Sequence, residues 1–561
     1  MISVFSARSR GRRKGWRAGK RLPALFAGGA LTLAACSGGD AQLVEPETTP
    51  TAPESEFLTP DGLAFVAGPQ TLRVSLPSIT FAAPHDLDES DASQVLVTDL
   101  LTDGLTRRNP ADGSIEPAVA HSFESSENGL IWTFDLGETT FSNGTTIIAD
   151  DVVASLNRVA ALGVSSISGP NLWPIEGWIE AGESEGATTV SGIRAAGPRL
   201  VEIQLTQPFE PLPEILSSVS FGILPAGVST LGEVGEVPLG SAVDFVPTDA
   251  WVDGLRLTGE QVDGEISTIE LFLDPDSVLL RAGETDLATA YDIDEPLDGL
   301  TGSAVQNSAG SYFAMNASIG PFNDPLIRQA VVRAIDTEAL RTAWFPNAGL
   351  LRSFIPQQIP GGVADACGSS CEFDLEQART LVQASPSRDI PFNVDFIARG
   401  GANRDNPEEA IANAVAETLR DIGLNATATS RTERGFGRLL ASGELGLFRF
   451  GSVSTSLSAE SNIGLPFHSN GLDNVTGTSI VRVDELIDEA RRTADPATRA
   501  NLYSQAESIL FAEAAVAPFV EFRHQLAFGE TLASVGLEPD GSLNLAHIVF
   551  DGEEPAILQG E

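Results

Sequence analysis

The sequence predicts a mixed α/β fold, and three observations support this class. Apolar and polar residues alternate in Ile131–Leu136 and in Leu200–Gln207, as in half-buried strands. A residue that can cap a helix stands directly before a proline at Asp324, Asn406 and Asp495, which is typical of helix starts. The chain has 561 residues, 42% of them hydrophobic. At ~100–200 residues per domain, roughly three to five folding units are expected.

The predicted helices carry apolar stripes at helical spacing, which we interpret as core positions. The stripes are Ile327, Val331, Ala334 and Ile335 in the first helix, and Ile411, Val415 and Leu419 in the second. Gly423 supplies a C-terminal stop for the second helix. Asp374 and Gln377 begin a further helix in a pattern close to a capping box.

The net charge of the chain and the position of its two lysines exclude several function classes. The chain has 34 basic and 77 acidic side chains, a net charge of −43, which repels nucleic-acid backbones. Both lysines, Lys14 and Lys20, lie in the leader. The body therefore has no lysine for a phosphate-binding loop or a Schiff base. We expect no nucleic-acid partner, no cofactor and no resident metal.

The N-terminus predicts export and lipid attachment. Residues 1–35 form a signal peptide with eight basic residues, no acid and an apolar stretch from Leu22 to Ala35. The sequence Leu33-Ala34-Ala35-Cys36 resembles the bacterial lipobox, which implies lipidation of Cys36 and a membrane anchor. The alternative is an ordinary signal peptide followed by a chance cysteine. Residues 36–68, rich in Pro, Thr, Ser and Glu, predict a flexible tether.

The other two cysteines, Cys367 and Cys371, are expected to form a disulfide in a surface loop outside the cytoplasm. A zinc site is the alternative, but no further Cys or His lies nearby in the sequence.

One stretch resembles a known family signature. The matching segments are Pro117–Ala120, Gly129–Phe134, Phe141–Thr145 and Ala149–Val153, in that order. The order resembles the family 5 extracellular solute-binding proteins, the oligopeptide, dipeptide and nickel receptors of ABC importers. The residues predict a turn at Asn143-Gly144 and then a helix with Val152, Leu156 and Val159 on its buried face. Later segments resemble family landmarks too: Gln207–Phe209, Leu280–Leu287, Tyr312–Asn316 and Pro321–Asp336.

The resemblance implies a two-lobed, periplasmic-binding-protein-like α/β fold of class II with an extra subdomain. Lobe 1 would span 69–311, with an inserted subdomain at about 85–200, and lobe 2 would span 312–518. Residues 519–561 would return to lobe 1 and end in a tail. The hinge would lie where the chain crosses between lobes, near Ser311–Asn316 and Pro518–Phe522.

The implied function is capture of a peptide-like or other small solute by lobe closure and delivery to a membrane permease. The chain would be an extracytoplasmic, lipid-anchored monomer, periplasmic or on the outer face of the membrane, and ATP hydrolysis would belong to separate subunits of the importer. A ligand-sensing lipoprotein without transport remains an alternative.

The ligand site is predicted from departures from the family pattern. Peptide-binding relatives carry an Asp that pairs with the α-amine of the ligand, but Phe448–Thr455 has no acid. Arg449 stands there instead, which favours a ligand with a blocked or absent amine and an anion that faces Arg449. The alternative is that Arg449 pairs with an acid of the protein. The expected ligand-binding residues are Arg449, Phe450, Ser452, Trp173, His85 and Asn316.

Each of the last three residues also has a structural interpretation: a core Trp173, a solvated His85 and a hinge-shaping Asn316. A secreted hydrolase is the remaining alternative, because Gly182–Gly186 formally matches the nucleophile elbow around Ser184. That motif needs a strand before it and a helix after it, and this Glu- and Gly-rich segment predicts neither. We expect no catalytic residue.

Overall fold

The computed structural model describes residues 63–64, 70–79, 83–87, 91–109, 112–163, 166, 168–183, 189–228, 245–251, 254–259, 266–293, 295–397, 407–453, 456–551 and 556–557. The predicted signal peptide, Cys36 and nearly all of the tether lie outside these residues. Within the described ranges, no helix is long and apolar enough to cross a bilayer.

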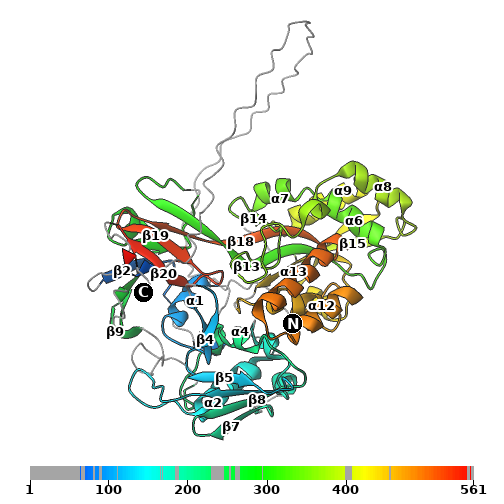
Figure 1. Ribbon diagram of the computed structural model, residues 1–561. Coiled ribbons are helices and arrows are strands. Elements are labelled where there is room, and N and C mark those ends of the chain that lie inside the picture. Colours follow the sequence, from blue (N-terminus) through cyan, green and yellow to red (C-terminus); the bar gives the residue numbers. More distant parts are fainter. Residues whose placement is uncertain are drawn as a thin grey trace. The chain divides into compact units, whose positions relative to one another are not determined.

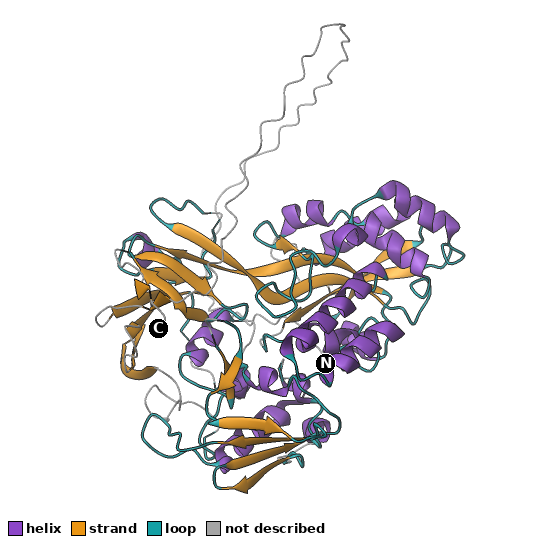
Figure 2. Ribbon diagram, in the orientation of Figure 1, coloured by secondary structure: helices purple, strands orange, loops and turns teal. Residues whose placement is uncertain are grey.

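The largest sheet among the described residues is mixed and has eleven strands (Figures 1 and 2). Its order is β16-β15-β17-β13-β18-β12-β2-β11-β10-β9, and β14 pairs with β18. The strands are β2 Gln70–Leu76, β9 Phe245–Trp251, β10 Gly254–Gly259, β11 Ile266–Leu273, β12 Leu287–Thr289, β13 Thr301–Met315, β14 Gly349–Leu350, β15 Phe392–Ile397, β16 Ala426–Arg431, β17 Leu447–Val453 and β18 Val516–Phe528.

We use lobe 1 for the part of the body built on β2 and β9 to β12. Its core contains Leu72, Val74 and Leu271, and the hairpin of β19 and β20 packs against it. Its remaining elements are β1 Leu63–Ala64, η1 Pro84–Asp86, α1 Ala92–Asp99, α5 Val278–Arg281, β19 Leu532–Leu537, β20 Leu543–Phe550 and β21 Ala556–Ile557. Leu96 and Val97 of α1 belong to this core, so α1 packs as part of lobe 1.

A second sheet, of order β5-β6-β8-β7, forms the unit inserted into lobe 1. One apolar core joins this sheet to α2 and runs from Leu105 to Ile223, whereas the sequence predicts a subdomain at about 85–200. The elements are β3 Thr106–Arg108, β4 Ile115–Pro117, β5 Ser122–Ser125, β6 Ile131–Asp135, α2 Ala149–Leu162, η3 Gly169–Leu172, α3 Trp178–Glu183, β7 Ile193–Gly197, β8 Leu200–Gln204, α4 Leu212–Leu216 and η4 Val219–Phe221. We call it the inserted unit.

We use lobe 2 for the part of the body built on β13 and β15 to β17, in which helices cover both faces of the sheet. Phe313 and Met315 of β13 point into one helical layer, whereas Tyr312 and Ala314 point into the other, because successive strand residues face opposite sides. The first layer contains α6 Pro325–Ala334, α8 Leu375–Ala384 and α9 Glu408–Asp421, with α7 Thr337–Trp344 beside it. The second contains α10 Glu433–Ala441, η6 Glu460–Gly464, α11 Leu465–Phe467, α12 Val481–Arg491 and α13 Pro496–Ala512, and η5 Gly368–Cys371 lies in a connecting loop.

The helix starts at Asp324, Asp374 and Asp495 are confirmed, since each carboxylate accepts a hydrogen bond from a backbone N–H of the first turn. The helix predicted after Asn406 begins at Glu408, and Asn406 itself lies outside the described residues. Gly423 follows the end of that helix at φ +99°, the left-handed conformation that ends helices. The strand predicted over Leu200–Gln207 is shorter in the structure, where β8 ends at Gln204.

Candidate functional site

Two long strands, β13 and β18, lie in the sheet between β17 on one side and β12 on the other. Their antiparallel pairing runs from Thr301 opposite Phe528 to Ala314 opposite Val516. The register shifts between Gln306 and Gly310 and again between Ser311 and Tyr312. Bulges of this kind locally increase the twist and the bend of a sheet. The irregular segment therefore lies beside the predicted crossing at Ser311–Asn316 and Pro518–Phe522.

Arg449 of β17 lies beside this irregular segment and is held by an acid. Its Nε donates to Oε2 of Glu408 at 3.0 Å, and its Nη2 also bonds to Glu408. Its Nη1 donates to Oγ of Ser311 at 2.9 Å, and the guanidinium lies 5.4 Å from the ring centroid of Phe345. The side chains of Arg449 and Glu408 are 23% and 20% exposed. The structure thus shows the pairing with an acid that the sequence left open as the alternative.

Phe450 points to the opposite face of the sheet from Arg449. Its ring packs in the second helical layer, 6.2 Å from the ring of Tyr312 and 6.1 Å from that of Phe448 between centroids. Arg449 and Phe450 are consecutive in one strand, so they cannot line the same face. The side chain of Ser452 lies outside the described part of the structure.

Trp173 follows η3 at the edge of the inserted unit and is partly exposed. Its ring meets the ring of Phe209 edge-on at 6.2 Å. The guanidinium of Arg491, from α12 of lobe 2, lies 5.1 Å from the Trp173 ring centroid. Trp173 therefore contacts a residue of the other lobe.

His85 and Asn316 occupy separate places. Nε2 of His85, in η1 of lobe 1, lies 3.7 Å from a carboxylate oxygen of Asp86. Asn316 is 4% exposed at the end of β13. Its Nδ2 donates to the carbonyl of Gly443, and its Oδ1 accepts from the amide of Ser318. The amide of Asn316 thus joins two loops of lobe 2.

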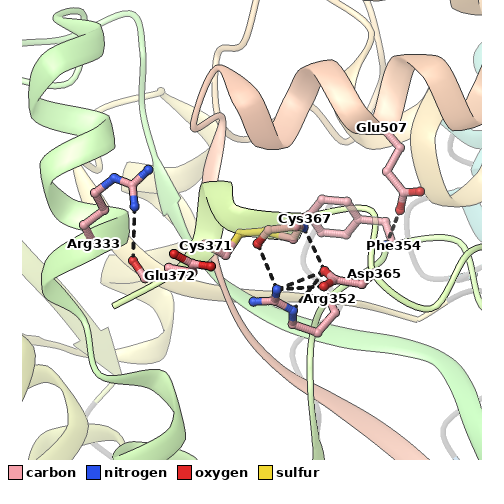
Figure 3. The surroundings of a disulfide bond; sticks show 9 residues. Arg333, Arg352, Phe354, Asp365, Cys367, Cys371, Glu372 and Glu507 are labelled. Atoms are coloured by element: carbon pink, nitrogen blue, oxygen red, sulfur yellow. Dashed lines mark hydrogen bonds and ion pairs between the residues drawn. A yellow bond between two sulfur atoms is a disulfide. The ribbon is translucent and has the colours of Figure 1, made fainter. Parts of the chain in front are cut away.

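Cys367 and Cys371 are joined by a disulfide, with their Cα atoms 5.8 Å apart (Figure 3). Arg352 organises this loop, because its guanidinium bonds to both carboxylate oxygens of Asp365 at 3.0 Å and to the carbonyl of Gly368 at 2.9 Å. The sequence predicts a bond in a surface loop, but Cys367 is 3% exposed. It is buried because its side chain belongs to the core of the second helical layer.

Near this loop, Glu507 of α13 lies fully buried (Figure 3). Its Oε1 accepts from Oγ of Ser353 at 2.9 Å, from the amide of Ile355 at 3.0 Å and from the amide of Phe354. Its Oε2 has no hydrogen-bond partner. Burial raises the pKa of Glu507 to about 7, although the three hydrogen bonds oppose this shift.

The described residues bear on two alternatives from the sequence, a metal site and a secreted hydrolase. Across the described ranges, no three His, Cys, Asp or Glu side chains gather in a way that could hold a metal ion. The segment around Ser184 begins on helix α3 rather than on a strand, and Ser184 itself lies outside those ranges. The local structure before Ser184 is therefore not that of a nucleophile elbow.

Comparison with known proteins identifies the family. The model of the bacterial extracellular solute-binding proteins, family 5, matches residues 114–247 and 274–474, more than half of the chain. The chain belongs to this family. Proteins of this kind are receptors rather than enzymes and work outside the cytoplasm with an ABC permease, so the chain is the substrate-binding protein of an ABC importer.

Individual relatives agree with this assignment. The glutathione-binding protein GsiB of Escherichia coli K12 is 22% identical over 456 residues, which cover 76% of this chain and 84% of GsiB. The structure of HbpA2 from Haemophilus parasuis matches with a TM-score of 0.68 at 19% identity, over 86% of this chain and 100% of HbpA2. The unliganded open form of MppA, a periplasmic murein tripeptide binding protein, gives a TM-score of 0.66 at 18% identity, over 88% and 99% of the two chains. These structures establish the two-lobed fold.

Sequence reasoning missed Glu408 and Arg491, the partners of two predicted ligand residues. Glu408 lies 41 positions before Arg449, and Arg491 lies far along the chain from Trp173. No local pattern indicates either contact. The opposite orientation of Arg449 and Phe450, by contrast, follows from the alternation of a strand and could have been predicted.

Proposed function

We propose that the receptor captures a peptide-like solute by rotation of lobe 2 against lobe 1 around β13 and β18. The observation that supports this proposal is the irregular pairing of these two strands at Gln306–Tyr312, beside the crossing between lobes that the sequence predicts. A closed form that gains contacts from the second lobe binds ligand better than an open form does, and this difference drives closure. The lobe boundaries at residues 311 and 518 belong to this proposal.

Arg449 is the residue we propose to face an anionic group of the ligand. It lies beside the crossing strands and keeps 23% of its side chain exposed. Glu408 balances its charge in the ligand-free protein, so a ligand carboxylate would share the guanidinium with Glu408 or displace it. Among the described residues, the acid that contacts Arg449 is Glu408, and the pairing of the two leaves this carboxylate less able to receive a free ligand amine. A ligand with a blocked or absent amine therefore fits this pair better.

The experiment begins with the protein as purified. The protein is denatured, and the released solute is identified by mass spectrometry. Calorimetric titrations then use this solute and a trialanine series with free ends, an acetylated N-terminus or an amidated C-terminus. We expect the acetylated peptide to bind at least as well as the free one. Amidation should weaken binding about tenfold to a hundredfold, the effect of losing one charge-assisted hydrogen bond.

Two variants sharpen this test. Arg449→Gln should remove the discrimination between free and amidated C-termini. Arg194→Gln is the matched control, because Arg194 pairs with Glu202 on the inserted unit. A strict requirement for a free α-amine would overturn the proposed ligand class. Failure to release any solute, together with no binding of the series, would overturn the peptide-like ligand.

We further propose lipid attachment at Cys36 and a monomeric receptor held at the membrane by residues 37–68. The supporting observation is the lipobox-like sequence Leu33–Cys36. Two or three acyl chains, at ~0.8 kcal/mol per buried CH₂, give a firm anchor. Metabolic labelling with radioactive palmitate should mark the protein, and Cys36→Ser should abolish the label. Equal labelling of both would exclude Cys36 as the acceptor.

A further inference from the structure

Besides the crossing strands, a group of polar contacts joins the inserted unit to lobe 2. The inserted unit contributes Arg108, Trp173, Glu210 and Glu214. Lobe 2 contributes Leu457, Ser458, Arg491 and Arg499. We call these eight residues the seam. In the inserted unit, Arg108 lies on β3 and Glu214 on α4, whereas Trp173 follows η3 and Glu210 precedes α4. The residues of lobe 2 lie on or beside the core formed by α12 and α13.

The first half of the seam is built on a buried ion pair. Arg491 and Glu460 have side chains 3% and 1% exposed, and Nη2 of Arg491 donates to Oε1 of Glu460 at 2.7 Å. The hydroxyl of Tyr503 donates to Oε2 of Glu460 at 2.7 Å. Burial alone would lower the pKa of Arg491, but the charge of Glu460 outweighs it and raises that pKa. Arg491 is therefore a fixed cation.

Arg491 contacts the inserted unit through its side chain and through its backbone. Its guanidinium lies 5.1 Å from the ring centroid of Trp173, within the range of cation–π attraction. Its backbone carbonyl accepts a hydrogen bond of 2.8 Å from the amide of Glu210. One residue of lobe 2 thus contacts both an aromatic face and the main chain of the inserted unit.

The second half of the seam centres on Glu214 of α4. One carboxylate oxygen pairs with Nη2 of Arg499, and the other accepts a hydrogen bond of 3.1 Å from Oγ of Ser458. The side chains of Arg499 and Glu214 are 8% and 20% exposed. A charge pair that is this well covered is screened less by salt than an exposed pair. Both partners of Glu214 belong to lobe 2.

A strained residue completes the seam. Leu457 has φ +48°, in the left-handed region that a side chain with a Cβ rarely adopts. Its carbonyl accepts a hydrogen bond from Nη2 of Arg108 on β3. Such a conformation is strained and persists only where surrounding contacts compensate for it. Arg108 supplies such a contact from the other side of the seam.

We propose that the seam is the latch of the closed receptor, and that the inserted unit is the surface on which lobe 2 closes. The inference rests on the proposed rotation about β13 and β18. The inserted unit joins lobe 1 at both its ends, and lobe 2 is reached through the crossing strands. Rotation of lobe 2 away from lobe 1 must therefore break the contacts at Trp173 and Glu214. The latch sets the balance between open and closed forms before any ligand arrives.

The test uses the purified, ligand-free protein. Glu214→Gln removes the negative charge that pairs with Arg499 and accepts a hydrogen bond from Ser458. Glu214→Arg places a second positive charge beside Arg499. The matched controls are Glu202→Gln and Glu202→Arg, since Glu202 pairs with Arg194 within the inserted unit itself. Small-angle scattering reports the separation of the lobes, and hydrogen exchange reports the amide of Glu210, which bonds across the seam.

We expect Glu214→Arg to increase the radius of gyration and to speed exchange at Glu210 about tenfold or more, the effect of losing one charge-assisted hydrogen bond. Glu214→Gln should change both in the same direction by less, and the Glu202 variants should match the wild type. Unchanged scattering and exchange in both Glu214 variants would overturn the latch. So would an equal response of the Glu202 variants.

Failure of the latch can be distinguished from misfolding of a variant and from failure of the proposed ligand specificity. Circular dichroism identifies a Glu214→Arg protein that fails to fold, in which case Glu214→Gln decides the matter alone. No ligand enters the scattering experiment, so its failure leaves the ligand specificity proposed for Arg449 standing. Conversely, failure of the peptide titrations leaves the latch to be judged by scattering and exchange.

Discussion

The inserted unit and the second helical layer of lobe 2 are stabilised by different kinds of interior. In the inserted unit, Asp151 is the one charged residue buried among those described between residues 105 and 223. Its carboxylate is satisfied by the backbone amides of Ile148 and Ala226, at 3.0 and 2.8 Å. Among its described residues, the layer on α12 and α13 buries the charged side chains of Glu460, Arg491, Arg499 and Glu507.

The two interiors tolerate substitutions to different degrees. An apolar core needs volume and shape, so conservative changes are tolerated when they preserve both. A polar core needs each partner in place, because a buried charge that loses its partner keeps the full cost of its desolvation. The layer that faces the inserted unit is therefore the less tolerant one. The following substitutions test this comparison.

The largest effect is expected at the buried ion pair. Arg491→Met or Glu460→Leu leaves one charge uncompensated and should destabilise the protein by about 3–5 kcal/mol. The double variant should lose less than the two single losses added together, because it buries no unpaired charge. Guanidinium unfolding followed by circular dichroism measures these differences, with Arg194→Met as the exposed control. Single losses below about 1 kcal/mol would contradict the polar core.

Gly464 shows that the buried ion pair also depends on the space around the Glu460 carboxylate. It lies in the π-helical turn η6, and a Cβ on it would overlap the carboxylate of Glu460. The side chain at position 464 must therefore be absent for Glu460 to reach Arg491 and Tyr503. π-helical turns recur at functional sites in proteins. In this receptor, the turn positions the carboxylate that holds a seam residue.

The next effect tests the apolar interior. Leu156 of α2 is fully buried, and Leu156→Ala should destabilise the protein by about 2–5 kcal/mol through lost contacts and a cavity. Leu156→Met keeps the volume and should cost less than about 1.5 kcal/mol. Thermal unfolding of both variants checks the pair. An equal loss for alanine and methionine would show that shape does not govern this core.

Helix starts were predictable from the sequence because they depend on neighbours within one turn. Asp324 and Asp495 cap their helices through amides two or three positions ahead. The buried faces of α2 and α9 follow from spacing in the same way, and Val152 and Ile411 lie where the pattern puts them. Local chemistry is sufficient for this part of the fold.

The ion pairs could not be predicted, because their partners are distant in the chain. Glu460 and Arg491 are 31 positions apart, and Glu214 and Arg499 are 285 apart. With 77 acids in the sequence, each arginine has many candidate partners. Only the packing of helices and sheets selects one of them. The residues of the proposed site therefore came from the family resemblance, whereas their contacts came from the structure.

The smallest effect depends on pH and concerns Glu507. Its pKa is about 7 in the folded protein, against 4.5 for an ordinary glutamate, so folding takes up a proton between these values. Stability therefore falls as the pH rises from about 4.5 to 7, by at most about 3 kcal/mol for this group. Glu507→Gln cannot ionise and keeps an oxygen for the amides of Phe354 and Ile355. It should match the wild type near pH 5 and exceed its melting temperature at pH 8.

The stability of the wild type must be compared with that of Glu507→Gln at each pH. Burial also raises the pKa of Glu538 to about 7, so the wild-type profile sums more than one group. Subtracting the variant's profile isolates the contribution of Glu507. A difference that stays constant from pH 5 to pH 8 would show that Glu507 does not titrate in this range, and it would overturn a folded pKa of about 7. If the variant were more stable by that constant amount, Glu507 would already be ionised at pH 5, and its Oε2 would then be satisfied by a partner such as an ordered water molecule.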